Sequence, residues 1–155
     1  MDSTVRQLHA FFNPDSVAVV GATKKIMKAG HVIFKNFEEN KRRGVFKGKV
    51  YAVNPNEESI LGIQSFPSLR AIPDEVELAV IVVPASAVLN VMDDAAAKGV
   101  KDVVIVSSGF GEIGNSELEG QVAAVGRKAG IMLFPCETFF LGRGDDLAVL
   151  DQRSR

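Results

Sequence analysis

The sequence has little cysteine, no tryptophan, almost no net charge and no long apolar run. One cysteine, Cys136, is present among the 155 residues. A single cysteine excludes an internal disulfide and a multi-cysteine metal site, so we expect no metal. No apolar run approaches the roughly 20 residues of a membrane-spanning helix. The first residues also lack the apolar stretch of a signal peptide. We therefore expect a cytoplasmic protein that does not bind membranes.

The charges are nearly balanced. There are 18 basic and 19 acidic side chains, which give a formal net charge of -1. This balance provides no electrostatic reason to expect nucleic acid or an anionic membrane as a partner. Hydrophobic residues make up 46% of the chain and charged residues 24%, which is typical of a globular domain with its own core.

Short apolar segments alternate with segments of helical periodicity. The expected strands are 16–20, 49–53, 78–83, 102–106 and 131–134, and the expected helices are 4–12, 28–43, 85–98 and 117–129. Strands that alternate with helices imply crossover connections and a parallel sheet. The sequence therefore predicts an α/β fold with a five-stranded, mainly parallel sheet. We expect one domain over residues 1–140 and a polar tail over residues 141–155.

The loop after the first expected strand, residues 21–30, has the composition of a phosphate site. It starts with a glycine, which allows a sharp turn, and the following helix directs free N–H groups at the loop. Lys24, Lys25 and Lys28 add positive charge, and Thr23 adds a hydroxyl donor. These features favour phosphate binding, and the alternative is a turn with solvated lysines.

The same loop lacks the fingerprint of a dinucleotide-binding domain. Thr23 stands at the second glycine of Gly-x-Gly-x-x-Gly, and Asn54 ends the second strand where an acidic residue would bind ribose hydroxyls. The P-loop is also excluded, because no Gly-Lys-Ser/Thr follows. An NAD(P)-binding redox-sensing domain is therefore an alternative that the residues disfavour.

Three further loops fall at the same edge of the expected sheet. Asn54-Pro55-Asn56 could hydrogen-bond a ribose or a base edge, although Asn-Pro is also an ordinary turn. Pro84 opens a helix and could present a flat surface to an adenine or a pantetheine arm. The loop 107–114 contains more glycine and serine than a turn needs. The carboxyl edge of a parallel sheet is where such folds bind ligands.

The two histidines, His9 and His31, do not form a recognisable triad or metal site with nearby residues. We expect no catalytic residue in this chain. His31 opens the first crossover helix and could touch a bound phosphate.

Taken together, the loops resemble one family. The stretches that carry the likeness are Gly-Ala-Thr-Lys-Lys-Ile-Met-Lys-Ala-Gly at 21–30, Val-Asn-Pro-Asn at 53–56 followed by Glu-Glu-Ser-Ile-Leu-Gly at 57–62, Ile-Val-Val-Pro-Ala at 81–85 and Ser-Ser-Gly-Phe-Gly-Glu at 107–112. Over residues 10 to 134 the chain resembles the CoA-binding domain of NDP-forming acyl-CoA synthetases and of the succinyl-CoA synthetase alpha subunit. It departs from the family at Ile26-Met27, where Pro-Gly is usual, and at Pro135-Cys136, where an asparagine is missing.

The resemblance implies a Rossmann-like three-layer sandwich that binds coenzyme A or acyl-CoA. In the family the first loop holds the CoA phosphates, the second lies by the nucleotide end, and the others line the rest of the site. The residues so implied are Ala22, Thr23, Lys24, Lys25, Asn54, Pro55, Asn56, Val82, Val83, Pro84, Val106, Ser107 and Ser108. With Gly21 and Lys28 of the first loop, they make up the predicted site.

The full synthetases place their phosphohistidine and their ATP-grasp domain outside this region. The resemblance therefore implies a CoA-binding module without complete catalytic machinery. The alternative is a subunit of an ADP-forming acyl-CoA synthetase that is active only with an ATP-grasp partner. A homo-oligomer is also left open, because Phe139-Phe140 could form an exposed apolar contact.

Overall fold

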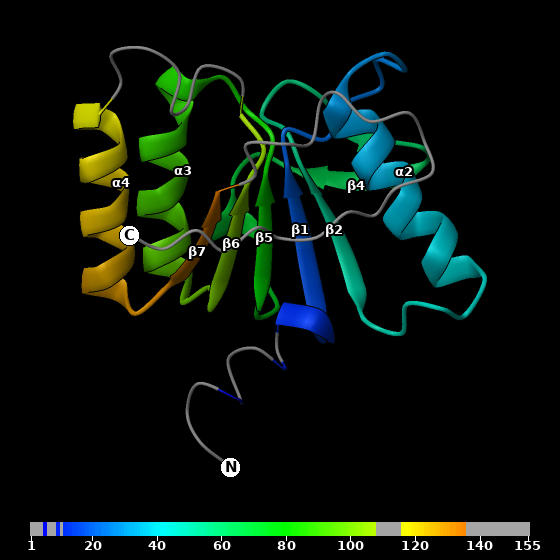
Figure 1. Ribbon diagram of the computed structural model, residues 1–155. Helices are drawn as coiled ribbons and strands as arrows, with labels where there is room; N and C mark the ends of the chain where they lie inside the picture. Colours follow the sequence, from blue (N-terminus) through cyan, green and yellow to red (C-terminus); the bar gives the residue numbers. More distant parts are fainter. Residues whose placement is uncertain (1–4, 6–8, 10, 108–115, 136–155) are drawn as a thin grey trace.

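The computed structural model describes residues 5, 9, 11–107 and 116–135, and shows an α/β fold (Figure 1). Its elements are β1 (Ser16–Val20), α2 (Ala29–Arg42), β2 (Lys49–Val53), β3 (Ser59–Ile60), β4 (Ile63–Phe66), the 3-10 helix η1 (Leu69–Ala71), β5 (Leu78–Ile81), α3 (Ala85–Lys98), β6 (Asp102–Ile105), α4 (Ser116–Ala129) and β7 (Met132–Pro135). Residues 5, 9, 11 and 12 of the expected first helix are helical. The expected tail, 141–155, lies outside the described residues.

The sheet has seven strands, not the five that we expected. Their order is β3-β4-β2-β1-β5-β6-β7, and only the β3–β4 pair is antiparallel. The predicted α/β class and mainly parallel sheet are confirmed. The two additional strands form a hairpin whose turn residues, Leu61 and Gly62, have φ of 52° and 76°. The hairpin was missed because a strand of two residues and a strand of four residues are too short to give a periodic pattern.

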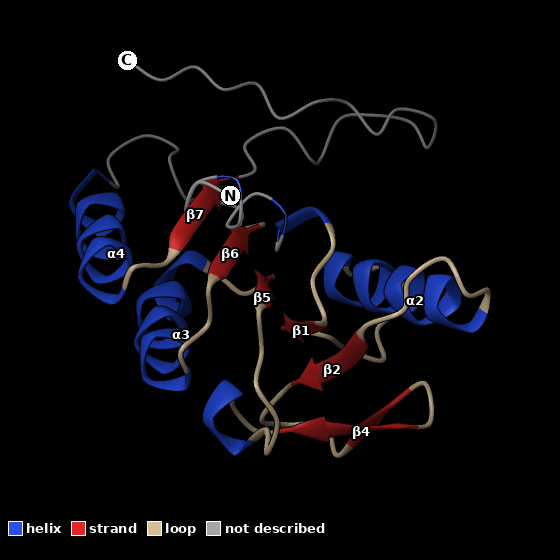
Figure 2. Cartoon of the chain, turned by 90° about the horizontal axis from the view of Figure 1, so that it is seen from below, coloured by secondary structure: helices blue, strands red, loops and turns tan. Residues whose placement is uncertain are grey.

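Helices cover both faces of the sheet. α3 and α4 pack on one face, and α2 lies on the other, over β1 and β2 (Figures 1 and 2). The strand β1 is buried along its whole length, which its apolar sequence predicts for a central parallel strand. Its side chains alternate between two cores, since Val17 and Val19 pack with Phe34 of α2, whereas Ala18 packs with Met92 of α3.

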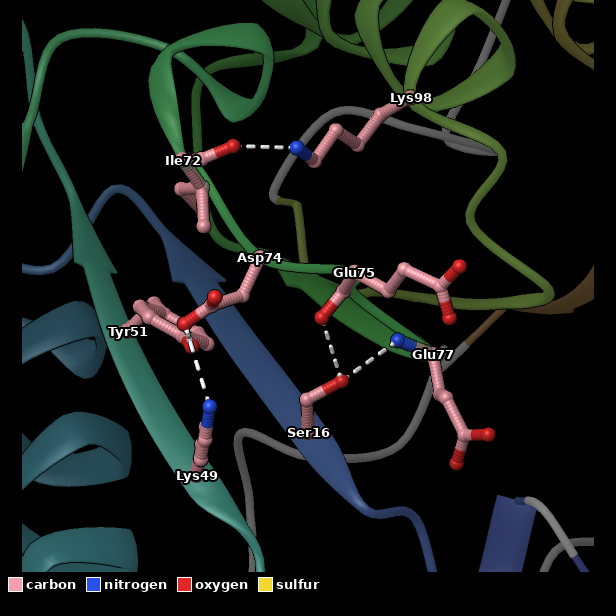
Figure 3. A network of polar contacts seen from close by, with 8 residues as sticks. All are labelled: Ser16, Lys49, Tyr51, Ile72, Asp74, Glu75, Glu77 and Lys98. Atoms are coloured by element: carbon pink, nitrogen blue, oxygen red, sulfur yellow. Dashed lines mark hydrogen bonds and ion pairs between the residues drawn. The ribbon is translucent and has the colours of Figure 1, made fainter.

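The amino edge of the sheet is held by a polar network (Figure 3). The Ser16 hydroxyl donates to the Glu75 carbonyl at 2.9 Å and accepts from the Glu77 N–H at 3.0 Å. The Asp74 carboxylate accepts hydrogen bonds from Tyr51 and Lys49. Burial and this carboxylate raise the pKa of Tyr51 to about 12, so the phenol remains a donor at neutral pH. The network ties the segment before β5 to β1 and β2.

None of the helices in the described ranges has both the length and the apolar character needed to cross a membrane.

Candidate functional site

A pocket of about 460 Å³ opens at the carboxyl edge of the sheet, where the connections after β1, β2 and β5 meet. Its walls are largely apolar and include Val20, Val53, Leu69 and Val91. Seven of the predicted site residues line it, namely Gly21, Asn54, Pro55, Asn56, Val82, Val83 and Pro84. Its volume lies in the range of pockets that hold small organic ligands.

The turn after β1 requires glycine at two positions. Gly21 has φ of 94°, and a Cβ there would lie 2.0 Å from the Val82 carbonyl oxygen. A Cβ at Gly30 would lie 2.0 Å from the Gly21 carbonyl oxygen. The backbone at Gly21 therefore lies against two neighbours, the residue after β5 and the first turn of α2. This places the first loop directly beside the pocket.

The first loop carries the predicted phosphate-binding residues. Lys24, Lys25 and Lys28 are exposed, whereas Ala22 is buried and Thr23 is half-buried. The three ammonium groups form no ion pair with the described part of the chain. The loop thus presents three positive charges at the N-terminus of α2.

The N-terminus of α2 adds to this positive potential. Lys28 is its N-cap residue and makes no side-chain capping bond, and the first turn contains no acidic residue. Free N–H groups and the positive end of the helix dipole therefore face the first loop. Together with the lysines, they make this region suited to an anion.

Asn54 joins the second loop to the first. Its Nδ2 donates to the Ala22 carbonyl at 2.8 Å, and its Oδ1 accepts from the Asn56 N–H at 2.8 Å. Both ends of the amide are thereby engaged with backbone. An acidic residue at this position could not donate to Ala22, which explains why asparagine suits this loop better than the aspartate of a dinucleotide site.

Two polar residues help to shape the first loop. One is His31, expected at the start of the first crossover helix and near a bound phosphate, and the other is Glu57, for which no role was predicted. The Nδ1 atom of His31 lies 2.8 Å from the Thr23 carbonyl oxygen, and the imidazole is buried. His31 therefore holds the loop from inside. The Glu57 carboxylate accepts a hydrogen bond from the Lys24 backbone N–H, and its Oε1 and Oε2 atoms lie 3.2 and 3.1 Å from that nitrogen. Its role was not predicted, because this contact spans 33 positions and depends on how two loops meet.

Val106 and Ser107 follow β6 and lie on that side of the site. Val106 is buried in the core on the α2 side and does not line the pocket. The Ser107 hydroxyl donates to the Val83 carbonyl at 2.6 Å, so it joins the third and fourth loops. Ser108 lies outside the described residues, as does most of the predicted fourth loop.

One residue of the pocket lining takes part in an ion pair. Arg70 of η1 and Asp94 of α3 approach to 2.7 Å between Nε and Oδ1, and Asp94 lines the pocket. This pair joins η1 to α3 next to the pocket. In the described ranges, no three His, Cys, Asp or Glu side chains are grouped as metal ligands would be.

Comparison with known proteins shows the family of the chain. The sequence model of a family described as CoA binding domain matches residues 15–137. The chain belongs to this family. The matched region contains every element of the sheet and all the loops around the pocket.

Several relatives are ADP-forming acetate–CoA ligases. The chain is 45% identical over 135 residues to ADP-forming acetate–CoA ligase II of Archaeoglobus fulgidus, which covers 86% of the chain and 20% of that protein. It is 40% identical over 128 residues to the alpha subunit of ADP-forming acetate–CoA ligase II of Pyrococcus furiosus, covering 81% of the chain and 27% of that subunit.

The solved structures give the same result. A dinucleotide-forming acetyl-coenzyme A synthetase 1 of Candidatus Korarchaeum cryptofilum, in complex with phosphate and ADP, is 40% identical with a TM-score of 0.76. The match covers 82% of the chain and 26% of that protein. The CoA-binding domain described here thus spans between a fifth and about a quarter of the length of these relatives.

Proposed function

We propose that this domain binds coenzyme A or an acyl-CoA, with the diphosphate held by the first loop. The observation that carries this proposal concerns the first loop. It starts at Gly21 in the lining of an apolar pocket, carries three exposed lysines and leads into an uncapped helix N-terminus. Backbone N–H groups and ammonium groups suit a diphosphate. Membership of the CoA binding domain family supports the same ligand.

The pocket and the first loop suit different parts of the ligand. Its apolar walls suit an adenine ring or the pantetheine arm, and the side chains of Asn56 and Ser68 offer polar groups at its edge. Gly21 and Asn54 belong both to the pocket lining and to the connection with the first loop. A single extended molecule with a charged diphosphate between an adenine and a pantetheine arm can therefore span both regions.

Within a larger enzyme, the domain would supply the CoA site of an ADP-forming acyl-CoA ligase. Its relatives include whole ligases and an alpha subunit of one. An ATP-grasp domain or subunit would then carry out the nucleotide-dependent steps, and the CoA thiol would extend from the pocket toward it. The cytoplasmic location and self-association stay predictions.

Alanine at both Lys24 and Lys25 tests the proposal. Each ammonium group can make a charge-assisted contact of about 1.5–3 kcal/mol, so the double variant should bind CoA at least about tenfold more weakly in calorimetry. The matched control is Lys35→Ala with Lys47→Ala, because both side chains are exposed and lie outside the first loop. The control should keep wild-type affinity.

Thermal-shift measurements with CoA, NAD and NADP test the ligand class in parallel. We expect CoA to raise the melting temperature of the wild type and the dinucleotides not to do so. An unchanged affinity in the Lys24/Lys25 variant would refute the placement of the diphosphate. A larger shift with NAD or NADP would refute the ligand.

A further inference from the structure

The donors of the first loop are occupied by an acidic side chain of the protein itself. The two oxygens of Glu57 lie 3.2 and 3.1 Å from the Lys24 backbone nitrogen. The Thr23 hydroxyl donates to the same carboxylate at 3.4 Å, and Asn54 Nδ2 lies 3.2 Å from it. A backbone N–H, a hydroxyl and an amide thus converge on one carboxylate.

These are the groups that the loop would offer to a phosphate. Carboxylate and phosphate oxygens are both anionic acceptors and compete for the same donors. Two anions placed on one backbone N–H would repel each other, and the repulsion is strong where protein excludes water on one side. A diphosphate can therefore take the Lys24 N–H only when the carboxylate has moved away.

The hydrogen bonds of the Glu57 carboxylate can be broken easily. Hydrogen bonds from a neutral N–H are most often about 2.9–3.0 Å long and those from a hydroxyl about 2.7–2.8 Å. The two nitrogen donors lie 3.1 to 3.2 Å from the Glu57 carboxylate, and the Thr23 hydroxyl lies 3.4 Å from it, so all of these contacts are longer than usual. No ion pair joins Glu57 to a lysine or arginine of the described residues. Its side chain is half-buried at the surface and follows the exposed Pro55 and Asn56, so it can turn toward water.

We infer that Glu57 is an internal competitor of the ligand's diphosphate and limits the affinity of the domain for CoA. The inference rests on the proposed function, since it places the diphosphate at the first loop. The carboxylate keeps the loop ordered, and CoA binds by displacing it. Lys24, Lys25 and Lys28 then gain an anion with more charge than the one that left.

The neutral isostere Glu57→Gln tests the inference in the full 155-residue chain. Removing the charge removes the competing anion and its repulsion of the diphosphate. The variant should bind CoA about tenfold more tightly, which corresponds to one charge-assisted hydrogen bond. The affinity for inorganic pyrophosphate can be measured by competition with CoA and corrected for each variant's CoA affinity. It should be about tenfold higher in Glu57→Gln than in the wild type.

Glu58→Gln is the matched control. It removes a carboxylate charge at the next position in the sequence. The Glu58 side chain is exposed and makes no hydrogen bond with the described residues of the first loop. Its affinity for CoA should stay within about twofold of the wild type, because solvent screens an exposed charge. Glu57→Ala repeats the test without any side-chain acceptor and should also bind more tightly.

Each outcome has a distinct meaning. Equal or weaker CoA binding by both Glu57 variants, with normal wild-type binding, would overturn the inference alone. Weaker binding would further indicate that the carboxylate contacts the ligand, as it would a ribose hydroxyl. Tighter CoA binding without stronger pyrophosphate competition would also overturn it. If neither the wild type nor the variants bound CoA, the proposed function would fail as well. Binding by the Glu57 variants alone would support the inference.

Discussion

Asp102 provides a test of the fold that does not depend on any ligand. It is the first residue of β6, at the amino edge of the sheet, and it is 0% exposed. Neither carboxylate oxygen accepts a hydrogen bond within the described part of the chain. Burial, and to a lesser extent the charge of Glu77, raise the pKa of Asp102 from 3.8 to about 6, and the nearby Lys101 partly opposes this shift.

The sign of the resulting pH dependence follows from linkage. Because the folded protein binds the Asp102 proton more tightly than the unfolded chain does, the charged carboxylate destabilises the fold at neutral pH and the cost disappears on acidification. A difference of about two pKa units corresponds to a total of roughly 3 kcal/mol. Between pH 7.5 and 5.5, with a folded pKa of about 6, the free energy of unfolding should rise by about 0.8 kcal/mol.

Urea denaturation at pH 7.5, 6.5 and 5.5 measures this rise, and Asp102→Asn is the matched variant. Asparagine keeps the shape and cannot titrate, so the difference in stability between the wild type and the variant isolates the contribution of Asp102 and should change by about 0.8 kcal/mol across this window. Asp74 and Glu77 do not interfere, because their pKa values are lowered from 3.8 and 4.5 and their stabilising charge is lost only at more acidic pH. A wild type that loses stability toward pH 5.5, or a variant with the wild-type slope, would refute the reasoning.

Two further substitutions test the site loops. Gly21→Ala would place Cβ 2.0 Å from the Val82 carbonyl oxygen at φ of 94°, and should lower the free energy of unfolding by more than about 3 kcal/mol. Gly44→Ala, with φ of 74° and open space around it, should lower it by about 1–2 kcal/mol. Equal losses of stability in denaturation would contradict this packing. Asn54→Asp should weaken CoA binding at least about fivefold, because it loses the donor to Ala22 and adds charge near the diphosphate; unchanged affinity in calorimetry would exclude this role.

The sequence predicted the main elements because their signals are local and strong. Residues 85–98 were expected as a helix, and α3 occupies Ala85–Lys98. The run that starts at Leu78 was expected to extend to residue 83, but β5 ends at Ile81 because the chain then turns toward Pro84. Apolar residues beyond the strand belong to the pocket rim, and composition alone does not distinguish the two environments.

The hairpin of β3 and β4 was missed for a physical reason. Its turn uses Leu61-Gly62 instead of the usual Asn-Gly, and Leu61 adopts a positive φ that leucine seldom takes. In β4 the residue buried with the core is Ser65, while Gln64 is exposed. Polar residues on both faces hide the alternation that would reveal a strand.

The site was partly predictable. The position of the first loop followed from Gly21 and the lysines, because the carboxyl edge of a parallel sheet is fixed by topology. The roles of His31 and Glu57 were not predictable, because each depends on a hydrogen bond to the first loop from another part of the chain. Such contacts appear only when the loops are placed in space.

A crystal structure of the chain with CoA tests the central claim most directly. We predict diphosphate oxygens within hydrogen-bonding distance of the Lys24 N–H and the first turn of α2, the rest of the nucleotide in the pocket beside Asn54, and the Glu57 carboxylate turned away. A coenzyme bound at the amino edge near Glu77, or a diphosphate remote from residues 21–30, would contradict the account.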